Sequence, residues 1–405
     1  MSKKLIIAIS VGLGIILLIL IGVMLFSGGS KNNSSGTGQK FLGFFPFGGS
    51  AAPVRPTATS TDTGPAPFSP QQSNYQNKLR KLSSEPVAGA GTYGTKTGTV
   101  VRFIEKATGH IYDVEMFSAN AARISNTTIT VVYDAVWGSG ATSLVTRYLK
   151  NDNQTIDTYA LTIQNVSTST DKVVNGVQFP TNILSFDVSG NSVFYLIQSG
   201  NGSIGITSDM NGGKKKQVWS SPLRELTGQF VNSSTIALTT KPETDLPGYL
   251  YLVNANTGAV KRIIGDVNGL SASVSPDGTL IAALANSTSM FIQKVSDNSR
   301  TPMTPATFPE KCVWSRKDKN VLFCAVPNET LDSSSLISWY KGLVSYDDQI
   351  WKYDLKTNTS SVIEDISKDT DEPIDAIKPI LSDDEQYLVF VNKKDGSLWS
   401  LDLTK

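Results

Sequence analysis

Short apolar runs separated by polar turns recur from about residue 86 to the C-terminus. The runs have the length and composition of β-strands, and none sustains a helical period. A similar unit recurs, with first strands expected to begin at Gly89, Thr130, Asn182, Glu225, Leu270, Glu310 and Ala376. The spacings are about 40 to 52 residues with one gap of about 66, and a four-stranded period near 40 to 50 is typical of a β-propeller blade.

Turn chemistry supports the same unit. "SVSPDGTLIAAL" carries Ser275-Pro276-Asp277-Gly278, where proline presets the turn and glycine supplies the left-handed position. "VWSRKDKNVLF" and "ILSDDEQYLVF" occupy the same place in later units. On these residues the chain resembles TolB-like and WD-repeat-like β-propellers over about residues 86–405, and as a whole it resembles bacterial membrane-anchored propeller proteins. The resemblance implies a fold and leaves the function open.

We therefore predict an all-β propeller of seven four-stranded blades over residues 86–405, with six or eight blades as alternatives. The last unit, from Ala376, has room for only three strands. A propeller closes its ring when one terminus completes the blade of the other, which protects the sheet edges. Residues around Leu79 to Val87 are expected to supply the missing outer strand.

The N-terminus predicts a membrane anchor. Lys3 and Lys4 precede an uncharged apolar run from Leu5 to Phe26, long enough as a helix to cross the hydrocarbon core. A cleaved signal peptide is the alternative, but the run is long for one and no A-x-A site follows. The lysines place residues 1–4 in the cytoplasm and the propeller outside it, in the cell envelope. Residues 27–85, rich in Ser, Pro, Thr and Gly, are expected to form a disordered linker.

One stretch of this linker is strongly apolar. "FLGFFPFGG" contains Phe41, Phe44, Phe45 and Phe47. It is a candidate docking peptide or an anchor that returns to the bilayer surface. Packing of these rings on the protein's own folded domain is the alternative.

The long gap in the repeat is explained by an insertion, "PNETLDSSSLISWYKGLVSYDDQ", between the second and third strands of the sixth unit. Loops of this length are usually functional or disordered, and this one is too apolar for disorder. Trp and Tyr are favoured at binding surfaces. The residues expected to contact a partner are Leu336, Ile337, Trp339, Tyr340 and Leu343. The alternative is that these side chains cap the blade and are buried.

The two cysteines lie in the same unit. If the hairpin pairs Ser315 with Lys319, Cys312 faces Leu322 and Cys324 lies diagonally on the same face of the sheet. A disulfide and two packed thiols both remain open, because diagonal neighbours are close but not ideally placed for a bridge.

Little in the sequence points to catalysis. Charged residues make up 18% of the chain with a net charge of +1, which argues against nucleic-acid binding, and His110 is the one histidine. "GAGTYG" at 89–94 matches G-x-G-x-x-G but is expected to open the first blade, without the helix that a nucleotide site needs. Asp347 and Asp348 in "SYDDQ" offer oxygen ligands, but their spacing is not that of a calcium loop. We expect no cofactor, nucleotide or metal.

These observations predict a membrane-anchored extracytoplasmic scaffold that binds another envelope protein or a surface polymer. A rigid ring presents preorganised loops on one face, so little entropy is lost on binding. The alternative is an envelope enzyme, a glycan hydrolase or lyase that uses paired carboxylates in the propeller channel.

Overall fold

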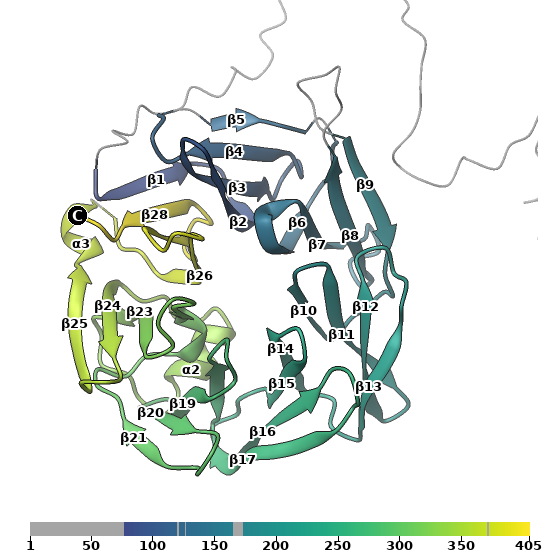
Figure 1. Cartoon of the computed structure of the whole chain (residues 1–405), viewed down its shortest axis with the longest axis vertical. Helices are drawn as coiled ribbons and strands as arrows, with labels where there is room; N and C mark the ends of the chain where they lie inside the picture. The colour runs from purple at the N-terminus through teal and green to yellow at the C-terminus, as the bar shows by residue number, and fades with distance from the viewer. Residues whose placement is uncertain (1–76, 120, 126, 165–172, 371) are drawn as a thin grey trace, which may run out of the picture. The chain divides into compact units, whose positions relative to one another are not determined.

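The computed structural model describes residues 77–405 apart from 120, 126, 165–172 and 371, and the domain is a seven-bladed β-propeller (Figure 1). Each blade is a four-stranded antiparallel sheet, with its first strand innermost and its fourth outermost. The predicted seven blades are confirmed. Each observed first strand begins within three residues of its expected start.

The first three blades follow one another along the chain. Blade one holds β2 (Val87–Thr95), β3 (Gly98–Glu105), β4 (Ile111–Glu115) and β5 (Ala121–Arg123). Blade two holds β6 (Val132–Trp137), β7 (Ser143–Leu149), β8 (Ile156–Gln164) and β9 (Val173–Gln178). Blade three holds β10 (Ser185–Ser189), β11 (Ser192–Ser199), β12 (Gly202–Asp209) and β13 (Lys216–Ser221).

The next three blades repeat this order. Blade four holds β14 (Leu226–Asn232), β15 (Thr235–Thr240), β16 (Pro247–Asn254) and β17 (Val260–Asn268). Blade five holds β18 (Ser271–Val274), β19 (Leu280–Ala285), β20 (Ser289–Lys294) and β21 (Arg300–Pro302). Blade six holds β22 (Cys312–Trp314), β23 (Val321–Pro327), β24 (Asp348–Asp354) and β25 (Thr359–Glu364). Short helices are η1 (Ser139–Ala141), η2 (Pro309–Lys311), α2 (Ser335–Tyr340) and α3 (Ile366–Asp369).

Blade seven joins the two ends of the domain. It holds β26 (Ala376–Leu381), β27 (Tyr387–Asn392), β28 (Leu398–Asp402) and, as its outer strand, β1 (Leu79–Ser83). Leu79 of β1 pairs antiparallel with Leu401 of β28. The predicted closure by residues near Leu79 is therefore confirmed, and it covers the edge that β28 would otherwise expose.

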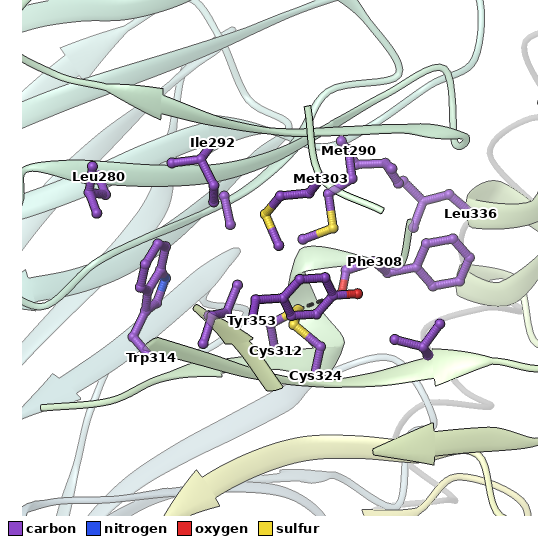
Figure 2. Close-up of a cluster of buried hydrophobic side chains, with 14 of the residues drawn as sticks. Leu280, Met290, Ile292, Met303, Phe308, Cys312, Trp314, Cys324, Leu336 and Tyr353 are labelled. Atoms are coloured by element: carbon purple, nitrogen blue, oxygen red, sulfur yellow. Dashed lines mark hydrogen bonds between the residues drawn. A yellow bond between two sulfur atoms is a disulfide. The ribbon is translucent and has the colours of Figure 1, made fainter. Parts of the chain in front are cut away.

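The hydrophobic core is divided among the junctions between blades. Seven clusters of buried apolar side chains are present in the described domain, and each joins two neighbouring blades. Alternation along each strand directs side chains to both faces of its sheet, so every blade packs on the blades before and after it. Figure 2 shows the cluster between blades five and six, which includes Phe308 and Trp314.

The hairpin of blade six differs from the expected register. Cys312 pairs directly with Cys324, and Trp314, not Cys312, faces Leu322. The predicted pairing of Ser315 with Lys319 is wrong, because the turn is longer: the Ser315 amide donates to the Val321 carbonyl at 3.0 Å. The Cys312 and Cys324 Cα atoms are 4.0 Å apart, and the two residues form a disulfide (Figure 2).

The predicted membrane anchor, Leu5–Phe26, lies outside the described residues, as do the linker up to residue 76 and its Phe41, Phe44, Phe45 and Phe47. Within residues 77–405, no helix is long and apolar enough to span a membrane.

Candidate functional site

The alternating strand directions give the propeller two faces. The insertion face carries the connections between blades and the loops between second and third strands, among them 241–246, 286–288 and 328–347. The hairpin face carries the turns between first and second strands and between third and fourth strands, among them 275–279 and 315–320. The inserted segment, 328–347 between β23 and β24, lies at the insertion face.

The short helix α2 fixes the inserted segment to the domain. Leu336 is fully buried and Trp339 is 6% exposed, so these two face the interior. The Trp339 ring packs on Phe308 with centroids 5.2 Å apart, and its indole N–H donates to Asp375 at 3.0 Å. The spacing i, i+3 places Leu336 and Trp339 on one side of the helix. They anchor the segment to the domain.

The remaining predicted contact residues are at the surface. Tyr340 is 46% exposed and Leu343 is 73% exposed, while Ile337 is half-buried. The Tyr340 hydroxyl donates to Glu310, which also accepts from Ser271 Oγ at 2.6 Å. Burial of the hydroxyl and the neighbouring Glu310 hold the pKa of Tyr340 well above its usual value, so the phenol stays a neutral donor.

The inserted segment reaches beyond its own blade. The Ser333 carbonyl accepts hydrogen bonds from Thr244 of the blade-four loop at 3.3 Å and from Ser287 of the blade-five loop at 3.1 Å. On the other side, Lys393 of blade seven donates to the carbonyls of Trp339 at 2.8 Å and Val344 at 3.0 Å. Contacts with four blades hold the segment in one place on the insertion face.

A buried charge cluster lies beneath α2. The Lys311 ammonium is 2.7 Å from Asp348 and 2.7 Å from Asp375, and all three side chains are 0% exposed. Asp375 is the acceptor of the Trp339 indole, so this cluster also supports the inserted segment. Asp348, considered from the sequence as an oxygen ligand, is a partner of Lys311. Lys311 and Asp375 were not predicted as site residues, because nothing in "PEKC" or "PIDA" marks a buried charge.

The axis of the ring holds a cavity of about 500 Å³ toward the hairpin face, lined by the innermost strands and turns of all seven blades. Its charged lining residues are Arg316 and Asp383, whose side chains form an exposed ion pair at 3.4 Å. Glycan hydrolysis by paired acids needs two carboxyl groups facing one site. The lining of this cavity contributes one, Asp383, and it is paired with a guanidinium.

No family model matches this chain, and the comparison with curated proteins found no match. The structure therefore establishes a fold, a seven-bladed propeller with one large insertion, and no family. The predicted relationship to TolB-like or WD-repeat-like propellers has no support from these comparisons.

The glycine motif "GAGTYG" forms most of β2, the innermost strand of blade one, and β3 follows it in place of a helix. The motif was expected to open the first blade, and its first two glycines pack closely against the second blade. A Cβ on Gly91 would lie 2.8 Å from Trp137 Cβ, and the Trp137 indole donates to the Gly89 carbonyl at 3.1 Å. The motif thus belongs to the junction between blades one and two.

Proposed function

We propose that the protein is a membrane-anchored, extracytoplasmic propeller that binds another envelope protein through its insertion face. One observation carries this proposal. Among the described residues, ten large apolar side chains are exposed, and seven of them lie at the insertion face. They are Val131, Tyr133, Leu149, Leu246, Tyr340, Leu343 and Val344. Three of the seven, Tyr340, Leu343 and Val344, belong to the inserted segment, and exposed apolar side chains gathered on one segment are typical of a protein-binding site.

The chemistry of these side chains favours a protein over a surface polymer. Five of the seven are valine or leucine, which offer no hydrogen bond to a glycan hydroxyl. They gain free energy by leaving water against other apolar groups. A surface polymer is the other partner class consistent with a scaffold.

The proposed location rests on the apolar run Leu5–Phe26 and on the cysteine pair. Disulfides persist in oxidising compartments outside the cytoplasm, and Cys312 and Cys324 are bridged. The linker of residues 27–85 would hold the propeller away from the bilayer, with the phenylalanine-rich stretch as a second docking element.

A relationship to TolB-like propellers is part of the proposal, supported by turn chemistry. Ser275 Oγ accepts from the Leu280 amide at 3.0 Å and donates to Asp277 at 2.7 Å. Ser382 in blade seven repeats both contacts, accepting from the Tyr387 amide at 3.0 Å.

Affinity capture of the full-length chain after crosslinking in intact cells tests the proposal. Replacing Tyr340 and Leu343 together with serine removes exposed apolar surface, and we expect about a tenfold or larger loss of the captured protein. The matched control replaces Phe117 and Val260, exposed on the hairpin face, with serine. Equal capture by the two double variants and the unmodified chain would refute binding through the insertion face.

A further inference from the structure

The buried charge cluster beneath α2 contains more acidic than basic side chains in direct contact. One amine, Lys311, faces two carboxyl groups, Asp348 and Asp375, in a site where all three side chains are fully buried. Buried carboxyl groups are costly unless they are paired and hydrogen-bonded, and Lys393 at the edge of the cluster is a second cation near Asp375. The cluster holds an amine and a carboxyl group at contact distance and away from water.

The contacts of the two carboxyl groups differ. Asp375 accepts from the Trp339 indole at 3.0 Å and from the Tyr346 amide at 3.1 Å, in addition to Lys311. These donors fix the position of the Asp375 carboxyl group beside the amine. Asp348 accepts one amide, from Ala376 at 2.6 Å, and burial raises its pKa to about 6, against the opposing effect of Lys311. Burial thus makes Asp348 easier to protonate than an ordinary carboxyl group.

We propose that Lys311 and Asp348 become joined by an amide bond between Lys311 Nζ and Asp348 Cγ, with loss of one water. Both Asp348 oxygens lie near the amine, at 2.8 and 2.7 Å from Nζ. Asp375 lies 2.7 Å from the same nitrogen and serves as the proton carrier. The Ala376 amide stabilises the negative charge that develops on an Asp348 oxygen during attack.

The steps balance without an oxidant or a co-reactant. The Lys311 ammonium gives one proton to the Asp375 carboxylate, and the neutral amine forms the C–N bond at the protonated carboxyl of Asp348. Asp375 returns its proton to the departing hydroxyl, so that the C–O bond breaks and water leaves. Asp375 then takes the second proton from the nitrogen. The products are a neutral amide, water and a protonated Asp375.

The bond would close a loop of the chain that contains the whole inserted segment, since Lys311 and Asp348 are 37 positions apart. It would replace a buried ion pair with a neutral amide and remove the desolvation cost of two charges. Like a disulfide, it would restrict the unfolded chain. The base of the inserted segment would then be covalently fixed to its blade.

The intact mass of the full-length chain, purified in detergent and reduced, tests the proposal. We expect a mass lower than that of the sequence by one water. We also expect a branched tryptic peptide joining the segments around Lys311 and Asp348, with no cleavage after Lys311. A mass equal to that of the sequence, together with cleavage after Lys311, would overturn the proposal.

Single substitutions test the role of each residue in the proposed amide formation. Lys311→Arg lacks a primary amine, and Asp375→Asn lacks the proton carrier, so both are expected to show the full mass. Lys393→Arg is the matched control, because Lys393 lies over the Trp339 ring at 4.8 Å but does not contact Asp348, and it should still lose water. Water loss in the Asp375→Asn variant would contradict the role assigned to Asp375. If a variant does not fold, the mass of the unmodified chain still decides.

Discussion

Replacing Lys311 with methionine is expected to lower the free energy of unfolding by about 3–5 kcal/mol. The substitution keeps a long side chain but removes the cation that contacts both buried carboxyl groups, Asp348 and Asp375. Because Asp375 also holds the Trp339 indole, the inserted segment is expected to loosen with it. Denaturant unfolding followed by tryptophan fluorescence measures the change. The expectation holds whether Lys311 is ion-paired or covalently joined, since either link is lost.

Lys319→Met is the control for this prediction. Lys319 lies 3.3 Å from Asp277, but both side chains are well exposed, so the pair is expected to contribute less than about 1 kcal/mol. An equal loss of stability in the two variants would show that burial of the cluster is not what makes Lys311 important.

Replacing Gly89 with alanine is expected to destabilise the junction of blades one and two by about 3 kcal/mol or more. A Cβ at this position would lie 2.1 Å from the Ala135 carbonyl oxygen and 2.9 Å from its carbon. Both are backbone atoms of β6, so relief requires the inner strands of two blades to move apart. The hydrogen bond from Trp137 to the Gly89 carbonyl would be strained at the same time. Thermal or denaturant unfolding measures the loss.

Gly94→Ala is a matched control in the same strand. No atom lies within 4 Å of a Cβ built on Gly94, and the residue is exposed. We expect a change within about 0.5 kcal/mol. If Gly94→Ala is as damaging as Gly89→Ala, strand propensity and not close packing explains the glycines of β2.

Much of the fold follows from local sequence. Each blade repeats a strand pattern whose turns are marked by Ser, Asp and Gly, so the number of blades and the closing strand could be predicted. The register of blade six could not, because the Ser315 turn is longer than the Ser275 turn and lacks proline and glycine. Ser315 bonds to Val321, two positions beyond the expected Lys319, and the same shift places Cys312 opposite Cys324 instead of Leu322.

The candidate site was predicted in part. The insertion was evident as a gap in the repeat, but Leu336 and Trp339 face inward. Their i, i+3 spacing was a signal that could have separated them from Tyr340 and Leu343. No comparable spacing in the sequence marked the buried charge cluster. Lys311 and Asp375 are 64 positions apart, and only the packing of blade six against blade seven brings them together.

Site-specific photocrosslinking tests most directly whether the insertion face binds a partner. A photoreactive residue replaces Leu343 in one sample of the full-length chain and Phe117 in another, in intact cells. These side chains are exposed on opposite faces of the ring. We predict an adduct with one envelope protein from position 343 and none from position 117. No adduct at position 343, or equal adducts at both positions, would contradict the proposed function.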